Sequence, residues 1–286
     1  MIKFVAKLLL LLLLFIHPGI SAAADGDRFI LLASTIGPID SGIVGALEDL
    51  FEQETGIRVR HVGAGTGAAL NIARRGNIDL VMVHARSLEE KFISEGCGTE
   101  RIPLMYNDFV IVGSPADPAG IGGAKTAVDA LKRIAGHGAL FISRGDKSGT
   151  HVAEMELWNK SGLKPAGAWY VNYEKGNEGN VPTLQYADEK EAYTVIDRAS
   201  YLFLKNRIKL VILTENDEML INYISLIPVN PQKYPGVNLT DTMNFIRWLT
   251  SPHQGQAIIR DFGKDKYGAP LFFPNSLEWQ AIRRKK

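Results

Sequence analysis

Residues 29–67 read FILLASTIGPIDSGIVGALEDLFEQETGIRVRHVGAGTG, and this stretch determines the fold class. The apolar run 29–33 predicts a strand, and 57–62 predicts the next one. Between them, apolar residues recur on one helical face: Ile43, Val44, Leu47, Leu50 and Phe51. Gly56 follows this face and predicts the end of the helix. A strand, an amphipathic helix and a second strand in this order predict an α/β fold.

The same alternation continues downstream and indicates two lobes. Further strands are predicted at 80–83, 109–112, 140–143 and 225–229, and further helices at 88–94, 127–136, 151–161, 240–249 and 254–262. The strands at 109–112 and 225–229 run into Ser114-Pro115 and Asn230-Pro231 and bracket a second α/β unit. We therefore expect the chain to cross between lobes twice, near residues 108–115 and 221–230. One larger doubly wound domain is the alternative.

The first 24 residues predict a signal peptide. Lys3 and Lys7 precede an apolar run, 8–16, and small residues at 21–24 offer a cleavage site. The run is shorter than the roughly 20 residues that span a bilayer. No Cys follows it, so the prediction is a free periplasmic protein rather than a lipoprotein. The mature chain is then expected to form lobe I from 25–110 and 228–286, and lobe II from 111–227.

The charge balance argues against a nucleic-acid partner. The chain holds 32 Lys and Arg against 31 Asp and Glu, whereas a protein that binds nucleic acid is usually basic. Cys97 is the single cysteine, so no internal disulfide can form. The sequence gives no sign of an oligomer, and we expect a monomer.

Loops rich in Ser, Thr and Gly occur where predicted strands meet predicted helices. A helix N-terminus exposes backbone N–H groups and the positive end of the helix dipole, so a small anion can bind there. Ordinary helix capping is the alternative for each hydroxyl taken singly. Loops of this kind in both halves of the chain predict one anion cage. The candidate ligand-binding residues are Ser34, Thr35, Thr66, Arg144, Ser148, Thr150 and Thr183.

Arg144 is the strongest of these candidates, because it follows a strand and lies among hydroxyl residues and glycines. A guanidinium donates hydrogen bonds and accepts none, which suits a dianion; a solvated surface side chain is the alternative.

An enzyme is the less favoured reading. A secreted hydrolase would use Ser148 with His151, but no Gly-x-Ser-x-Gly motif is present. The histidines show no metal-ligand spacing. We therefore expect no catalytic residues, no metal and no cofactor.

The sequence resembles the extracellular tungstate-binding proteins of bacterial ABC uptake systems, a branch of the type II periplasmic binding proteins. The similarity covers nearly the whole mature chain. The matching runs are Thr66-Gly67, Arg74-Arg75-Gly76, Glu89-Glu90-Lys91-Phe92, Met105-Tyr106-Asn107-Asp108-Phe109-Val110-Ile111-Val112-Gly113, Ser143-Arg144-Gly145-Asp146, Ser148-Gly149-Thr150-His151, Ala187-Asp188-Glu189-Lys190, Phe262-Gly263-Lys264-Asp265 and Pro270-Leu271-Phe272-Phe273-Pro274.

The resemblance implies two α/β lobes joined by a two-strand hinge, with an oxyanion held between them and a membrane permease as partner. Carried over from the family, the anion ligands are Ser34 and Thr35, Thr66, Arg144 with Ser148 or Thr150, and Thr183. The first loop departs from the family's run of Thr and Ser, since it continues as Ile36-Gly37-Pro38. Ala85 also stands where the family has Asp.

Tungstate is the expected ligand. It is a dianion near neutral pH and only accepts hydrogen bonds, so a cage of donors suits it. Molybdate and sulfate share its charge and shape and remain alternatives. Phosphate near neutral pH usually keeps a proton and benefits from an acceptor, and Asp40 and Asp146 leave that alternative open.

Overall fold

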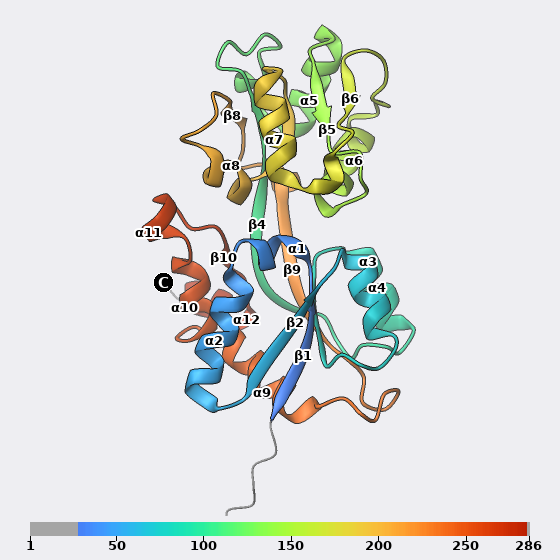
Figure 1. Ribbon diagram of the computed structural model, residues 1–286, viewed down its shortest axis with the longest axis vertical. Coiled ribbons are helices and arrows are strands. Elements are labelled where there is room, and N and C mark those ends of the chain that lie inside the picture. The colour runs from blue at the N-terminus through green and yellow to red at the C-terminus, as the bar shows by residue number, and fades with distance from the viewer. Residues whose placement is uncertain (1–27, 285–286) are drawn as a thin grey trace, which may run out of the picture.

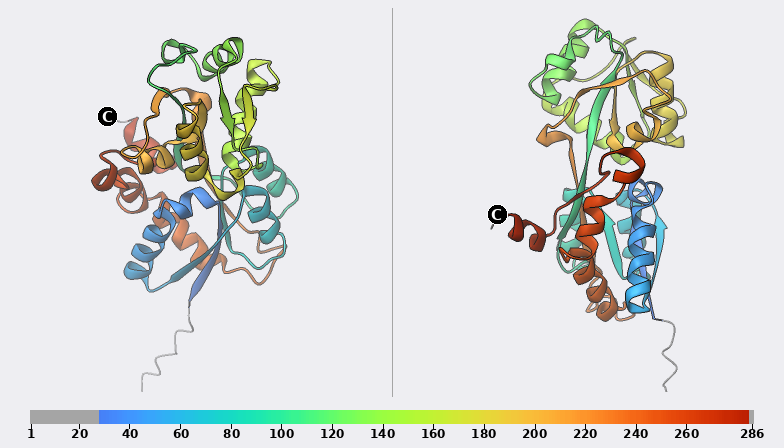
Figure 2. Two further views of the ribbon diagram at one scale, coloured as in Figure 1. Left: turned by 45° about the horizontal axis from the view of Figure 1, so that its top comes forward. Right: turned by 90° about the vertical axis from the view of Figure 1, so that its left-hand side faces the viewer.

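The computed structural model describes residues 28–284, which form two lobes joined by two long strands (Figure 1). These strands are β4 (Ile102–Gly113) and β9 (Ile221–Pro228). The first half of β4 pairs with β9, up to the Asp108–Ile221 pair. The second half pairs with β7 (Thr194–Asp197) and β8 (Val211–Thr214). Strand β4 thus contributes to the sheets of both lobes, as Figure 2 shows, and the predicted two-lobed α/β architecture is confirmed.

The sheet of lobe I has the order β10-β4-β9-β3-β1-β2. Its other strands are β1 (Phe29–Ser34), β2 (Arg58–Gly63), β3 (Leu80–Val83) and β10 (Phe273–Pro274). Strand β1 is parallel to both β2 and β3. Their carboxyl ends therefore lie at one edge of the sheet, and α1 (Ile36–Asp40), which follows β1, lies at the face toward lobe II (Figure 1).

Helices cover both faces of this sheet. The larger core packs α2 (Ile43–Thr55), α9 (Leu239–Thr250) and α10 (Gly255–Asp261) against one face. The smaller core packs α3 (Thr66–Ala73) and α4 (Arg86–Ser94) against the other. Helix α2 ends as predicted, because Gly56 adopts a left-handed conformation with φ 71°. The short helices α11 (Lys264–Tyr267) and α12 (Leu277–Arg283) close the described chain.

Lobe II adds a pair of short parallel strands, β5 (Phe141–Ser143) and β6 (Tyr170–Asn172). Its helices are α5 (Ala127–His137), α6 (Gly149–Ser161), α7 (Asn180–Glu189) and α8 (Arg198–Leu204), with 3-10 turns at 121–123, 176–178 and 218–220. Trp158 of α6 fills the centre of one core, edge-on to Phe141 and Tyr170. Among residues 28–284, no helix is long and apolar enough to cross a membrane. The predicted signal peptide lies outside the described residues.

Both hinge strands are longer than the sequence predicts. β4 begins at Ile102 rather than at Phe109, and β9 begins at Ile221 rather than at Ser225. In β4 the segment 102–106 contains Pro103 and is separated from the apolar run 109–112 by Asn107 and Asp108. In β9 Asn222 follows the first residue, so neither strand reads as one apolar run. Asn222 Nδ2 donates to Asn107 Oδ1 at 2.7 Å, which satisfies two polar side chains within the hinge.

Candidate anion-binding site

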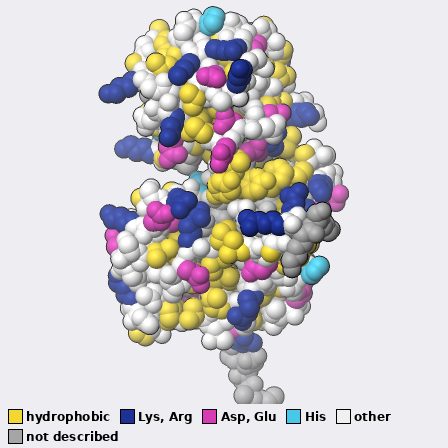
Figure 3. Space-filling view, turned by 180° about the vertical axis from the view of Figure 1, so that it is seen from behind, with side chains coloured by type: hydrophobic (Ala, Val, Ile, Leu, Met, Phe, Trp, Pro, Cys, Tyr) yellow, Lys and Arg dark blue, Asp and Glu magenta, His cyan; other side chains and the backbone are white. Residues whose placement is uncertain are grey.

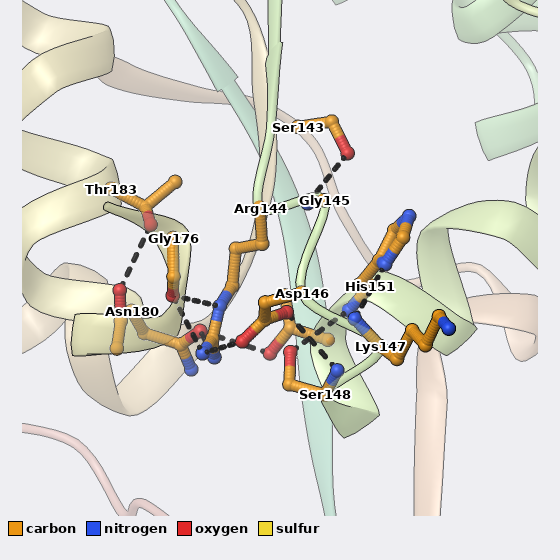
Figure 4. Close-up of polar contacts among 12 residues, drawn as sticks. Ser143, Arg144, Gly145, Asp146, Lys147, Ser148, His151, Gly176, Asn180 and Thr183 are labelled. Carbon is orange, nitrogen blue, oxygen red and sulfur yellow. Dashed lines mark hydrogen bonds and ion pairs between the residues drawn. The ribbon is translucent and has the colours of Figure 1, made fainter. Parts of the chain in front are cut away.

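The loop of residues 143–148 connects β5 to α6 (Figure 4), and Lys147 within it lines a groove between the lobes. Gly145 and Lys147 have positive φ angles of 65° and 63°. A side chain at Gly145 would also meet Asn172, because a Cβ there would lie 2.9 Å from the Asn172 Cβ. These two residues turn the chain so that Ser148 caps α6 by accepting from the N–H of His151 at 3.4 Å.

Arg144 is anchored within lobe II by three acceptors (Figure 4). Nη1 donates to Asn180 Oδ1 at 2.5 Å, and Nη2 donates to Asp146 Oδ2 at 2.5 Å. The carbonyl oxygen of Gly176 accepts from Nη2 at 3.0 Å and from Nε at 3.2 Å. Because the side chain is only 10% exposed, the guanidinium is fixed before any ligand arrives.

The carboxylate of Asp146 accepts hydrogen bonds from within the same loop. Its second carboxylate oxygen accepts from the N–H of Ser148 at 3.0 Å. Burial alone would raise the pKa of Asp146, but hydrogen bonds from Ser148 and the charge of Arg144 outweigh burial and hold this pKa below its ordinary value. Asp146 is therefore ionised at neutral pH, and its acceptor capacity is directed at Arg144 and Ser148.

Asn180 belongs to the hydrogen-bond network around Arg144, and the sequence did not reveal it. It is the first residue of α7, a position that reads as ordinary capping. Its Oδ1 accepts from Arg144 and also from Thr150 Oγ1 at 3.0 Å, and its Nδ2 donates to Asp197 Oδ2 at 2.5 Å. Asn180 thus connects Arg144 and Thr150 to the carboxylate that caps α8.

Thr183 differs from its predicted setting. The sequence placed it ahead of a helix, but it lies within the first turns of α7, because this helix already begins at Asn180. Its side chain is fully buried, and its hydroxyl donates to the carbonyl oxygen of Gly179 at 2.9 Å. The hydroxyl proton of Thr183 is therefore engaged inside the helix.

The predicted lobe I ligands lie at the ends of β1 and β2. Ser34 is buried, and its hydroxyl donates to the carbonyl oxygen of Thr35 at 3.3 Å. Thr35 is 2% exposed, and within residues 28–284 its hydroxyl has no hydrogen-bond partner. Thr35 stands at the N-cap of α1, yet its side chain does not cap the helix. Thr66 begins α3 and is half-buried.

The two lobes approach each other next to these residues. A Cβ on Gly149, at the start of α6, would lie 2.5 Å from the ring of His84, which follows β3. A groove of about 1150 Å³ runs between the lobes beside this contact, and Thr66 is among its lining residues. The surface is hollowed at the same junction when seen from behind (Figure 3). The pKa of Asp40 is raised by burial and by the charge of Asp197 in the opposite lobe.

The arrangement around Ser148 does not match a serine hydrolase. Its hydroxyl faces the backbone N–H of His151 rather than the imidazole, and His151 Nδ1 accepts from the N–H of Lys147 at 2.8 Å. A nucleophile needs a base within hydrogen-bond reach of its hydroxyl. In the described part of the chain, no group of His, Cys, Asp and Glu side chains is arranged to hold a metal ion.

Comparisons with known proteins agree on one family. The family model of the PBP superfamily domain matches residues 21–253. A curated tungstate-binding protein TupA from Peptoclostridium acidaminophilum is 42% identical over 249 residues, which are 86% of each chain. The solved structure of TupA from Desulfovibrio alaskensis is 38% identical, with a TM-score of 0.79 over 87% of this chain and 99% of that chain. The structure of the tungstate ABC transporter from Geobacter sulfurreducens is 43% identical, with a TM-score of 0.72 over 82% and 98% of the two chains.

Proposed function

Since this chain belongs to the PBP superfamily and to the family of the TupA substrate-binding proteins, we propose that it captures tungstate outside the cytoplasm for an ABC importer. The type II periplasmic binding fold, which the sequence resemblance implied, is confirmed by the same relatives and by the two-strand hinge. The membrane permease of that importer is the expected partner.

The proposed ligands are Ser34, Thr35 and Thr66 from lobe I, and Arg144, Ser148, Thr150 and Thr183 from lobe II. The hydroxyls of Ser34, Thr150 and Thr183 donate to protein acceptors in this structure, so each has to turn to the anion when it binds. The observation that carries the proposal is the unpaired hydroxyl of Thr35. A buried hydroxyl without a partner costs free energy, and such groups in folded proteins usually have one. Thr35 lies at the carboxyl end of a parallel strand, where α/β proteins bind ligands. An oxyanion between the lobes supplies the missing acceptor.

Replacing Thr35 with valine tests this role. Valine keeps the shape and removes the hydroxyl, so we expect tungstate binding to weaken by about 1–3 kcal/mol, which is roughly 5- to 150-fold. The ligand-free protein should unfold at the same or a higher temperature, because the substitution removes an unsatisfied polar group. Calorimetric titration and thermal unfolding measure the two effects.

Thr240→Val is the matched control, since Thr240 is exposed on α9. A Thr35→Val protein that binds tungstate like the control would contradict a ligand role for Thr35.

The lobes are proposed to close on the anion. The predicted division, lobe I from 25–110 and 228–286 and lobe II from 111–227, is supported by β4, which changes pairing partners between Asp108 and Phe109. The pairing of β9 with β3 and β4 along its length favours a second crossing near Ile221, at the start of the predicted range 221–230.

We expect tungstate to reduce the radius of gyration in small-angle scattering, because hinge closure is common where a ligand binds between lobes. An unchanged radius, with binding shown by calorimetry, would argue for a rigid molecule.

The remaining parts of the proposal follow from the sequence. We infer export to the periplasm through the predicted signal peptide 1–24. We also infer a monomeric protein with no nucleic-acid partner and no catalytic activity. Molybdate, sulfate and phosphate are the competing ligands. The commitment of Asp146 to Arg144 and Ser148 disfavours it as an acceptor for the proton of phosphate.

A further inference from the structure

A buried carboxyl group lies directly behind the 143–148 loop. Glu154 of α6 is 2% exposed. Its Oε1 accepts from the hydroxyl of Tyr170 at 2.7 Å and from Trp158 Nε1 at 3.1 Å, and its Oε2 accepts from Ser143 Oγ at 2.7 Å. All three donors are neutral, so no cation compensates the charge that this group carries when it ionises.

Glu154 is connected to the backbone turn that presents Arg144. Ser143 Oγ donates to Glu154 and accepts from the N–H of Gly145 at 3.2 Å (Figure 4). Ser143 and Gly145 flank Arg144 on both sides. The chain of hydrogen bonds from Glu154 through Ser143 to Gly145 therefore fixes the backbone from which the guanidinium projects.

The surroundings of Glu154 favour its protonated form. Burial raises the pKa of Glu154 to about 7, although the hydrogen bonds from Ser143, Tyr170 and Trp158 act in the opposite direction. Tyr170 on β6 is the titratable group in contact with it, and its own pKa is raised by burial and by Glu154, so it stays neutral.

Ser143, Tyr170 and Trp158 are the groups whose hydrogen bonds act on the pKa of Glu154 among the described residues, and all three are neutral. α5 contributes Ala130, Leu131 and Ile134. Tyr193, which precedes β7, donates its hydroxyl to Asp117 at 2.8 Å.

We propose that Glu154 is a positioning residue for the anion, and that binding of a dianion in front of the 143–148 loop is accompanied by proton uptake at Glu154. The inference rests on the proposed oxyanion site. An ionised carboxylate behind the loop repels a dianion in front of it, and the low dielectric of the core screens this repulsion only weakly. The bound anion therefore makes protonation of Glu154 more favourable, and by linkage protonation of Glu154 strengthens binding by the same factor.

The sign of the pH dependence follows from this linkage. Below pH about 7 most of the free protein already carries the proton, and affinity is highest. As the pH rises through this value, binding must recruit a proton, so affinity falls. We expect a fall of roughly three- to tenfold between about pH 6.5 and pH 8.5, as order-of-magnitude values for like charges across a protein interior.

The test is calorimetric titration of sodium tungstate into the full-length mature protein near pH 7, in buffers of different ionisation enthalpy. Wild type is expected to take up a fraction of a proton per anion bound. Glu154→Gln resembles the protonated form, keeps an oxygen for Tyr170 and Trp158, and should bind without proton uptake and with little pH dependence. Glu189→Gln is the matched control, because Glu189 is exposed at the end of α7 in the same lobe. It should behave like wild type.

Ser143→Ala tests the positioning role. This variant breaks the connection of Glu154 to Gly145, so we expect affinity to fall by about three- to tenfold below neutral pH. It also removes a donor that lowers the pKa of Glu154, so the further fall in affinity with rising pH should move to higher pH than in wild type. Equal proton uptake by wild type and Glu154→Gln, or unchanged affinity in Ser143→Ala, would overturn the inference while leaving the proposed function standing. Wild type that gives no binding heat with tungstate and is not stabilised by it would overturn both.

Discussion

Replacing Arg144 with alanine is expected to weaken tungstate binding by about 2–5 kcal/mol, which is roughly 30- to several thousand-fold. A dianion that leaves water needs charge compensation, and hydroxyls and backbone dipoles supply only partial charges. Arg144 carries a full positive charge, which Asp146 partly offsets, in a fork that Asn180, Asp146 and Gly176 already hold in place. Its loss should therefore cost more than the loss of any single hydroxyl.

The pairing of Arg144 with Asp146 enlarges this expected effect. In Arg144→Ala the carboxylate of Asp146 remains in the loop without its cation, because Ser148 still holds it. A dianion then meets an unpaired negative charge, so repulsion adds to the lost attraction. The double variant Arg144→Ala with Asp146→Asn should recover part of the loss.

Arg86→Ala is the matched control for Arg144→Ala. Arg86 is also near the junction of the lobes, but its side chain is 76% exposed and pairs with Glu90 at 2.7 Å on the same helix. Calorimetric titration should give wild-type affinity for this variant. If Arg144→Ala binds like wild type while Arg86→Ala fails, Arg86 carries the charge, and the site lies outside the 143–148 loop.

Replacing Gly176 with alanine is expected to destabilise the protein by about 3 kcal/mol or more and to weaken anion binding as well. A Cβ at Gly176 would lie 1.9 Å from the carbonyl oxygen of Arg144, and a backbone atom cannot rotate away as a side chain can. The segments around Gly176 and Arg144 must separate, which also displaces the carbonyl oxygen that accepts from the guanidinium.

Gly236→Ala is the control for this steric effect, since no atom lies within 4 Å of its added Cβ. Denaturant unfolding compares the free energies of unfolding of the two variants, and titration compares their affinities. A Gly176→Ala protein as stable as Gly236→Ala would show that the two segments do not lie as close in solution.

The sequence predicted the buried elements well because burial leaves a periodic apolar pattern. β3 has its predicted bounds, and α2 ends where Gly56 permits a left-handed turn. The full length of the hinge strands was harder to predict. Asn107 and Asn222 pair with each other across β4 and β9, and these two polar residues interrupt the apolar pattern of both strands. Hydrogen bonds between strands that are far apart in the sequence leave no pattern in the residues of either strand alone.

The residues of the candidate site, too, could be predicted only in part from the sequence. Arg144 stood out in the sequence because it is a charged residue among Ser and Gly at a strand end, and its ligand role stays a prediction. Asn180 was missed because an Asn at a helix start indicates a cap equally well. Glu154 was missed because a single Glu in an amphipathic helix normally faces water, and only the tertiary contacts to Tyr170 and Ser143 show that it is buried. The environment of Thr183 depended on where α7 begins, and helix boundaries are the least determined feature of a sequence.

Thermal unfolding of the mature protein with tungstate, molybdate, sulfate or phosphate at equal concentration tests the central claim most directly. A ligand that binds only the folded state, present at about 100 times its dissociation constant, adds about 2.7 kcal/mol of stability. Tungstate is predicted to raise the melting temperature more than phosphate does, because the proposed ligands are hydrogen-bond donors. The carboxylate of Asp146, which could accept the proton of phosphate, already accepts from Arg144. A melting temperature raised by phosphate and unmoved by tungstate would contradict the account.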